Sequence, residues 1–541
     1  MTLTFQPSDA GLNLADIQGN ILTAYGKSGF PTGRNLLLHV AAGRAAAGRT
    51  FLRALLPRVT TAVRWPSRKY GHFGAVEIPR PPATLNSAFT FWGLAALELP
   101  VRTLRDFPDE FIDGMSRRAT ILGDDLLGSP HDGWDAVWRN EHTSDKNVHI
   151  LLMLNSQMDP ATGRPVPALD ALTQQIRALA AASEGAVTIL AGHGQAGSDT
   201  QELSAIMTQV DGGYAPTPKE HFGFTDGVSN PVFQGQYPAK IEAERARGAG
   251  KFGKDGVWRP LATGEFLLGH TDEAQEIAGG YTLRAFARNG TFIAYRKLQE
   301  NVARLDRWIA ETAVRFGTVF GIADPEAARQ TLRAKMVGRW IDGVPLSMAP
   351  DYAAWQNQHA SSHDDFGHRA DLSNYLYSDD PDGAKCPFSA HARRANPRDA
   401  NGPLPADGLK PGPSGTILSN RRRLLRRALP YGARDWAAGE DGEHGVVMFI
   451  MCASLARQYE FVQQQWINYG NDNNAGNDTD PLLGQHGPTA KFVIPADDAS
   501  GHGPFIADKI PQFVESKGGA YFFMPSLTAL SMLGMGIIDP T

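Results

Sequence analysis

The stretch GVVMFIMCASLARQYEFVQQQW, residues 445–466, contains the two kinds of element from which the chain is built. Its first part, 445–453, is a continuous apolar run and predicts a buried strand. Ser454 follows at the position of a helix cap, and four apolar residues then recur on one helical side: Leu455, Tyr459, Val462 and Trp466. A strand that leads directly into an amphipathic helix indicates a fold of interspersed strands and helices.

The same succession extends outward along the chain. Bounded apolar runs predict buried strands at 90–99, 147–155, 186–191 and 290–298, and helical periodicity predicts helices at 168–181 and 301–316. Two stretches of similar content indicate an α+β protein with a duplicated topology. Between them the segment 212–220, rich in glycine and proline, predicts a connection between domains.

Composition excludes several classes of function. The 541 residues include 52 Lys and Arg against 57 Asp and Glu, a net charge of −5, which predicts no nucleic-acid partner. The two cysteines, Cys386 and Cys452, cannot form a disulfide framework or a four-thiolate zinc site. No apolar run reaches membrane-spanning length and no export signal is visible, so we expect a cytoplasmic protein with no membrane partner; no pattern indicates an oligomeric state.

Asp226 lies among glycines in HFGFTDGVSNP, residues 221–231. Glycines permit a tight turn and a close approach of the backbone to a flat or bulky ligand. The alternative is a plain turn in which the Asp226 carboxylate caps its own backbone.

His391 lies in CPFSAHARRANPR, residues 386–398. A neutral imidazole is a common axial ligand of heme iron, whereas the alternative is a partly buried ring that only forms hydrogen bonds. Cys386 stands in an apolar context, which favours an inert structural thiol over a nucleophile.

Five arginines gather within RRRLLRRALPYG, residues 421–432. They are typical of a solvated charged face. If Leu424 and Leu425 point into the core, however, a neighbouring arginine is drawn in with them, and a buried guanidinium must be paired or serve a ligand.

A rival site is the segment HASSHDDFGH, 359–368, which could supply ligands for zinc or manganese: His359, His363, Asp364, Asp365 and His368. No glutamate lies between the histidines as a metalloprotease helix requires, and Gly367 weakens a helix here. A polar loop is therefore the favoured interpretation.

Taken in order, GFTDG (223–227), CPFSAHARRANPR (386–398) and LLRRALPYG (424–432) resemble the dye-decolorizing peroxidases. DIQGNIL (16–22) resembles the N-terminal signature of that family, and 449–466 and 518–530 resemble its C-terminal elements. The resemblance spans nearly the whole chain, and the long loops are similar to those of the larger, fungal-like subgroup. It implies two ferredoxin-like α+β domains with antiparallel sheets and heme held between them. We place an N-terminal domain at 1–215 and a C-terminal domain carrying the heme site at 216–541.

The resemblance also assigns the site. It implies heme b, with His391 as the proximal ligand of the iron, Asp226 as the distal aspartate and Arg426 as the distal arginine. A long insertion before the arginine motif leaves the adjacent Arg427 as an alternative to Arg426. Glu460, on the helix after the core strand, is our candidate for the carboxylate that accepts the second N–H of the proximal histidine, and an Asp or Glu elsewhere in the chain is the equal alternative.

The function implied is a peroxidase that uses hydrogen peroxide to oxidise bulky organic donors such as dyes and phenols. Such chemistry needs a carboxylate that accepts and returns a proton and a fixed positive charge, the parts assigned to Asp226 and Arg426. The alternatives are a heme-handling protein with incidental turnover and a non-heme hydrolase that uses 359–368. For electrons from large donors we expect Tyr431 near the heme and Trp436 at the surface, with Trp340 and Trp466 as alternative exits.

Overall fold

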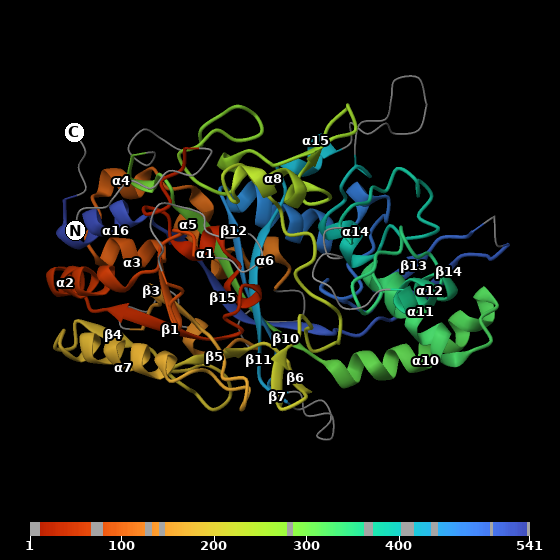
Figure 1. Cartoon of the computed structure of the whole chain (residues 1–541), viewed down its shortest axis with the longest axis horizontal. Helices are drawn as coiled ribbons and strands as arrows, with labels where there is room; N and C mark the ends of the chain where they lie inside the picture. Colours follow the sequence, from red (N-terminus) through yellow and green to blue (C-terminus); the bar gives the residue numbers. More distant parts are fainter. Residues whose placement is uncertain are drawn as a thin grey trace.

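One antiparallel sheet runs through the structure, a computed structural model that describes residues 11–65, 79–124, 133–139, 146–278, 285–361, 372–401, 416–433, 442–497 and 501–537. Within these ranges the sheet has nine strands, in the order β11-β12-β10-β15-β2-β3-β1-β4 with β5 also paired to β1. The strands are β1 (Thr32–Val40), β2 (Ala83–Phe89), β3 (Ile150–Ser156), β4 (Val187–Ile189), β5 (Gln201–Ser204), β10 (Thr291–Glu300), β11 (Leu425–Tyr431), β12 (Gly445–Cys452) and β15 (Val514–Met524). Figure 1 shows this sheet at the centre, with α2, α3, α7 and α16 toward one end and α10, α11, α12 and α14 toward the other.

The first part of the chain forms a ferredoxin-like unit. Its elements follow as β1, helix α2 (Ala45–Leu55), β2, β3, helix α7 (Ala168–Ala181) and β4, with β1 between β3 and β4 in the sheet. The apolar sides of both helices cover one face of the strands: Phe51 and Leu52 of α2 and Leu169 and Ile176 of α7 belong to the same buried cluster.

The second part repeats this succession. It runs through β10, helix α10 (Val302–Phe320), β11, β12, a helical segment and β15, and the sheet order β11-β12-β10-β15 matches that of the first unit. The helical segment consists of the π-helical stretches η6 (Leu455–Glu460) and η7 (Val462–Ile467). The expected α+β fold with two ferredoxin-like units is confirmed, while the domain boundary at residue 215 stays a prediction.

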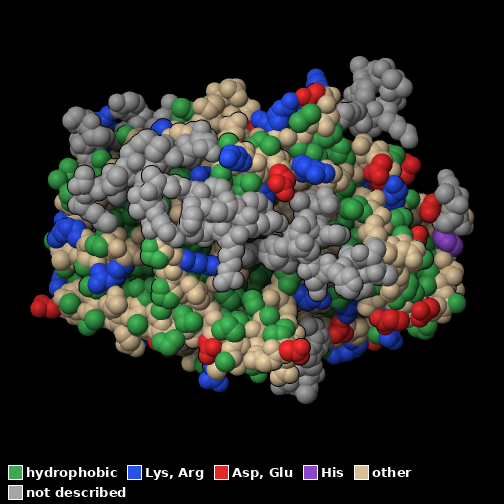
Figure 2. All heavy atoms as spheres, viewed as in Figure 1, with side chains coloured by type: hydrophobic (Ala, Val, Ile, Leu, Met, Phe, Trp, Pro, Cys, Tyr) green, Lys and Arg blue, Asp and Glu red, His purple; other side chains and the backbone are tan. Residues whose placement is uncertain are grey.

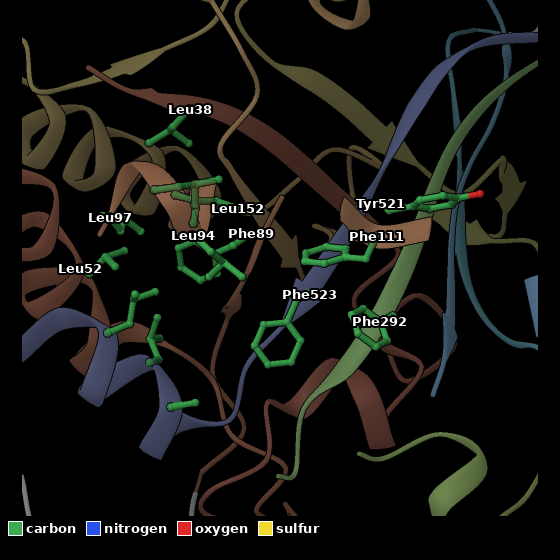
Figure 3. Close-up of a cluster of buried hydrophobic side chains, with 14 of the residues drawn as sticks. Leu38, Leu52, Phe89, Leu94, Leu97, Phe111, Leu152, Phe292, Tyr521 and Phe523 are labelled. Atoms are coloured by element: carbon green, nitrogen blue, oxygen red, sulfur yellow. The ribbon is translucent and has the colours of Figure 1, made fainter. Parts of the chain in front are cut away.

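The two units share one sheet and one core. β15 joins β2 through the pair Phe523 and Phe89, so the strands of both units form a continuous surface. Around this junction lies an aromatic cluster in which the ring centroids of Phe292 and Phe523 are 5.9 Å apart and those of Phe111 and Phe292 are 5.2 Å apart (Figure 3). Buried rings of this kind dominate the energetics of a core and fix the second unit to the first.

Short helices and hairpins fill the long connections. The helices are α1 (Gly19–Leu22), α3 (Phe91–Ala96), α4 (Val101–Arg105), α5 (Asp109–Asp113), α6 (Ala119–Leu122), α8 (Ala239–Ala246), α11 (Pro325–Val337), α12 (Tyr352–Ser361), α14 (His391–Ala395), α15 (Thr416–Asn420) and α16 (Leu527–Met535). The hairpins are β6–β7 (Met207–Val210, Gly213–Pro216), β8–β9 (Lys251–Phe252, Trp258–Arg259) and β13–β14 (Lys491–Ile494, Phe505–Asp508).

Most predicted elements are confirmed, with one correction. The run 90–99 is not a strand: β2 ends at Phe89, and the Thr90 hydroxyl accepts the Gly93 N–H at 3.0 Å and begins helix α3. A continuous apolar run fits a buried helix as well as a strand, so its periodicity could not decide between them. The segment 212–220 contains β7 of a hairpin, and its interpretation as a connection between domains stays a prediction.

On the face that Figure 2 displays, basic and acidic side chains are interspersed among the coloured ones. In the described part of the chain, every helix is too short or too polar to cross a membrane.

Candidate active site

A cavity of about 280 Å³ lies in the second unit, and the described residues that line it fall between 220 and 516. One wall is the sheet, where every second residue of two neighbouring strands lines the cavity: Arg296, Leu298 and Glu300 of β10, and Val446, Met448 and Ile450 of β12. Helical segments supply much of the remaining wall, which is largely apolar and includes Val337, Ala392, Ala395, Tyr459, Val462 and Ile467. Such a cavity can hold a large apolar group with a few polar attachments.

Strand β11 directs its two adjacent arginines to opposite faces of the sheet. Arg426 lines the cavity. Arg427 lies on the other face, where its Nε donates to the Asn20 carbonyl oxygen at 2.8 Å and its Nη2 to that of Ile21 at 2.6 Å. Burial lowers the pKa of Arg427 to about 10. The geometry therefore favours Arg426 over Arg427 as the arginine of the site.

Asp226 and Arg426 meet at one side of the cavity. Arg426 Nη1 lies 3.7 Å from Asp226 Oδ1, and Arg426 Nη2 donates to the Val228 carbonyl oxygen at 3.1 Å. The backbone N–H of Arg426 also donates to Asn230 Oδ1 at 3.0 Å. Three contacts thus connect the strand to the 221–231 segment and hold the guanidinium beside the carboxylate.

The local sequence fixes the loop that carries Asp226. Gly223 and Gly227 adopt φ values of +95° and +68°, which residues with a Cβ rarely tolerate. The Glu220 carboxylate accepts the N–H groups of Phe222 and Phe224, both at 2.7 Å. Asp226 Oδ1 also accepts the Gly227 N–H, so the turn interpretation and the cavity position of Asp226 both hold.

His391 is the first residue of α14 and also lines the cavity. Its Nδ1 lies 2.8 Å from Asp480 Oδ2, and the other oxygen of Asp480 accepts the N–H groups of Leu482 and Leu483 at 2.9 Å each. With Nδ1 engaged, Nε2 is the ring nitrogen available to a ligand in the cavity.

The contact between His391 and Asp480 favours a protonated imidazole and an ionised carboxylate. Burial alone would lower the pKa of His391, but the adjacent Asp480 carboxylate raises it above its usual value. Burial would likewise raise the pKa of Asp480, but His391 and Arg394 hold it below its ordinary range. A carboxylate that accepts the N–H of an imidazole fixes the tautomer and makes the other nitrogen a better ligand.

The expectation that Glu460 accepts the second N–H of His391 is wrong. Arg118 donates to both Glu460 oxygens, at 2.5 and 2.8 Å, and the Tyr521 hydroxyl donates to one of them at 2.9 Å. Asp480 takes the place assigned to Glu460. Sequence reasoning missed it because the pair is separated by 89 positions, and the only local signal is the aspartate of NDTDPLL (477–483) before a leucine pair.

One end of the cavity is cationic, which the sequence did not predict. Arg339 Nη2 donates to Ser229 Oγ at 3.0 Å and lies 3.2 Å from the Tyr375 hydroxyl. The Arg398 guanidinium lies 3.9 Å from the Tyr375 ring centroid. Burial would raise the pKa of Tyr375, but the two arginines bring it below its usual value.

Arg423, from the arginine-rich run, belongs to the same end. It donates to the carbonyl oxygens of Gly250 and Ala249 at 3.2 and 3.1 Å, and burial lowers its pKa to about 9. This end of the cavity can therefore receive carboxylates.

Other predicted residues fall elsewhere. Tyr431 is not among the described residues that line this cavity: it shares the face of Arg427, and Lys297 Nζ lies 4.6 Å from its ring centroid. Trp340 and Trp466 are buried at 0% and 4% exposure and are also absent from the lining among the described residues. Cys386 is buried, which raises the pKa of its thiol to about 11, as an inert thiol requires.

Two predictions lie outside the described residues. Trp436 is one of them. The metal segment 359–368 is the other, since its residues from 362 onward and the side chain of His359 are not described.

Comparison with known proteins gives relatives along nearly the whole chain, although no family model matches it. The chain is 26% identical over 547 residues to Peroxidase 2 of Mycetinis scorodonius, which covers 97% of this chain and 88% of the relative. It is 27% identical to the multifunctional dye peroxidase DyP2 of an Amycolatopsis species, with 97% of both chains covered.

Solved structures agree with these relatives. A dye-decolorizing peroxidase in complex with 2,6-dimethoxyphenol is similar at a TM-score of 0.68 and 25% identity, covering 97% of this chain and 100% of the other. The dye-decolorizing peroxidase of Auricularia auricula-judae has the same fold, with a TM-score of 0.69, 23% identity and 97% and 99% coverage. With a shared fold, near-complete coverage and the ordered motifs brought together at one cavity, the chain is similar in sequence and in fold to the dye-decolorizing peroxidases.

Proposed function

We propose that this protein binds one heme b through His391 and uses hydrogen peroxide to oxidise organic donors such as dyes and phenols. One observation carries the proposal: an imidazole backed by a carboxylate and a paired aspartate and arginine line the same cavity. The phenol bound to the similar peroxidase supports phenols as donors.

The residues present fit a heme. His391 Nε2 is placed to bind the iron, and the apolar strand and helix residues suit a flat porphyrin ring. Arg339 and Arg423 at the cationic end suit its two carboxylates. When bound, the heme supplies the redox-active iron at which peroxide is reduced.

Asp226 and Arg426 divide the remaining work on peroxide. The Asp226 carboxylate accepts a proton from one oxygen of hydrogen peroxide and returns it to the other oxygen, which leaves as water. Arg426 presents a fixed positive charge beside it and stabilises the negative charge that develops as the oxygen–oxygen bond breaks. Asp480 keeps His391 Nδ1 protonated, so that Nε2 faces the cavity as the ligand atom.

Loss of the ligand nitrogen tests the proposal. His391→Ala purified and reconstituted with heme is expected to lose the Soret absorption that the reconstituted wild type displays. His502→Ala, outside the cavity, serves as the matched control and should bind heme as the wild type does. Equal heme content and spectra in His391→Ala and wild type would refute the assignment.

Location is a separate matter. A cytoplasmic location stays a prediction, which fractionation of the native cells tests.

A further inference from the structure

The half-buried Glu220 and the buried Glu300 meet at the edge of the cavity beside Asp226. Glu220 precedes the loop of Asp226 and Glu300 ends β10; both line the cavity, and they accept the N–H groups of the consecutive residues Phe222 and His221, which holds the two carboxyl groups side by side. Glu300 is 5% exposed. Two ionised carboxylates side by side repel each other, whereas a protonated carboxyl group can donate to an ionised one, so the pair is stable when it holds one proton.

The surroundings provide for one negative charge and not for two. Glu220 accepts two backbone N–H groups, and Glu300 Oε2 accepts the His221 N–H at 3.0 Å. Across the described ranges, neither carboxyl group forms an ion pair with a lysine, arginine or histidine. Backbone dipoles can hold one ionised carboxylate, whereas a second one in the same buried position would be repelled at close range.

The charged groups around the pair reinforce this. Asp226, from the following loop, adds a negative charge, and Arg426 on β11 is directed to Asp226. Arg296, on β10 with Glu300, is committed to Asp124 by two contacts of 2.6 Å.

More distant groups complete the surroundings. His221 packs its ring 5.0 Å from that of His444, while Arg339, Arg423, Tyr375 and His391 line other parts of the cavity. Burial raises the pKa of Glu220 and of Glu300, and the charge of Asp226 raises both further.

The reaction needs a proton source at this place. Reduction of one hydrogen peroxide to two waters consumes two electrons, which the organic donors give up, and two protons. Asp226 moves a proton from one peroxide oxygen to the other and so adds none. A group that stores a proton next to Asp226 would supply what the aspartate cannot.

We propose that Glu220 and Glu300 share one proton and deliver it through Asp226 during peroxide reduction. The O–H bond of the pair breaks, the Asp226 carboxylate gains the proton and passes it to an oxygen atom derived from peroxide, and solvent restores the pair. The proposal rests on the proposed peroxidase function, but the presence of the shared proton does not. Glu220 and Glu300 act through Asp226 and are therefore positioning residues.

The diagnostic variant is Glu300→Gln. A glutamine amide can donate to Glu220 in place of the shared proton, so the contact and the loop are retained while the acid is lost. Glu300→Asp keeps the acid and serves as the conservative variant. Glu460→Gln, which removes a buried carboxylate held by Arg118 outside the cavity lining, is the matched control.

Infrared spectroscopy of the heme-free protein tests the shared proton. At pH 6 the wild type should show a protonated carboxyl band that shifts in deuterium oxide; this contribution should disappear in Glu300→Gln and persist in Glu460→Gln. A wild-type and a Glu300→Gln spectrum with equal carboxyl bands would overturn the proposal, whatever the protein catalyses.

The pH dependence of turnover tests whether the pair delivers its proton to Asp226. With heme bound, the rate at which the wild type oxidises a small phenol should fall as pH rises, because the pair of Glu220 and Glu300 loses its shared proton. Glu300→Gln should turn over about tenfold more slowly at pH 5, lose that pH dependence and keep its heme content, with partial recovery in Glu300→Asp.

Identical pH profiles for the active wild type and Glu300→Gln would overturn delivery by the pair. A wild type that binds no heme and reduces no peroxide would instead overturn the proposed function and leave the infrared result standing.

Discussion

The alternation of side chains along β11 separates two neighbouring arginines by function. Arg426 faces the cavity beside Asp226, whereas Arg427 on the opposite face donates to backbone carbonyls of the N-terminal segment. Adjacent residues of the same type therefore have different consequences when changed. Sequence motifs alone left either one as the arginine of the site, and strand geometry distinguishes them.

Arg426→Lys and Arg427→Lys should separate reaction from stability. Lysine retains the charge at 426 but not the planar fork, so the reaction with peroxide should slow while the free energy of unfolding changes little. Arg427→Lys should lower that free energy by about 1–3 kcal/mol, because a buried carbonyl loses its donor, and leave the peroxide rate unchanged. Stopped-flow kinetics and urea unfolding measure the two effects. A slower reaction with peroxide in Arg427→Lys and a lower free energy of unfolding in Arg426→Lys would show that Arg427, and not Arg426, serves the site.

Asp480 illustrates a residue whose importance depends wholly on its partner. Asp480→Asn retains the shape but can no longer stabilise a positive or strongly polarised imidazole, so heme affinity should fall about 10–100-fold. Titration of the heme-free protein with heme measures it. Asp478→Asn is the control two positions away, since Asp478 accepts from Ser389 rather than His391; equal losses in both variants would refute a specific role.

At the scale of elements, the segment 445–466 could be predicted in detail from the sequence. The apolar run forms β12, Ser454 caps the helix by accepting the Arg457 N–H at 3.2 Å, and the predicted apolar stripe is buried. Local signals suffice here because strand, cap and stripe all lie within a few residues of one another. The π-helical form of η6 and η7 has no local signal that we used.

Other parts of the molecule could not be predicted in this way. The run 90–99 has no period that separates helix from strand, and Thr90 alone marks the start of the helix. Asp480 meets His391 only because the chain folds, and no spacing rule connects positions so distant. Residues whose role lies in one motif were therefore found, whereas those defined by a remote contact were missed.

Loss of the helix cap at Ser454 should weaken heme binding, because the helix that begins there forms part of the cavity wall. Ser454→Ala should cost about 1 kcal/mol of stability, as should Ser526→Ala, which removes the comparable cap of α16. Only the first helix contributes side chains to the cavity, so heme affinity should fall in Ser454→Ala and not in Ser526→Ala. Calorimetry and heme titration of both proteins check this, and a loss of affinity in both would point to a general effect of stability.

At the scale of the whole molecule, one sheet and one aromatic cluster connect the two units. The cavity residues belong to the second unit, but their strands pair with those of the first through Phe523 and Phe89. The two units should therefore unfold together rather than one after the other.

Phe523→Ala should test this coupling. Removing a fully buried ring at the junction should lower the free energy of unfolding by about 3–5 kcal/mol and broaden or divide the unfolding transition. Phe320→Ala, at a half-buried ring of α10, should cost less and leave one transition. Denaturant unfolding followed by circular dichroism and tryptophan fluorescence distinguishes them; coincident single transitions in Phe523→Ala would mean that the junction does not couple the units.

The alternation in β11 also limits how this gene can change in length. Deleting or inserting one codon within 425–431 would exchange the faces of the residues beyond it, turning a cavity arginine into a structural one or the reverse. A single such event would remove both the site contact and the attachment of the N-terminal segment. We therefore expect natural variants to gain or lose codons in the connections flanking this strand, and a library of one-codon insertions scanned across 416–433 to lose heme binding sharply within its bounds.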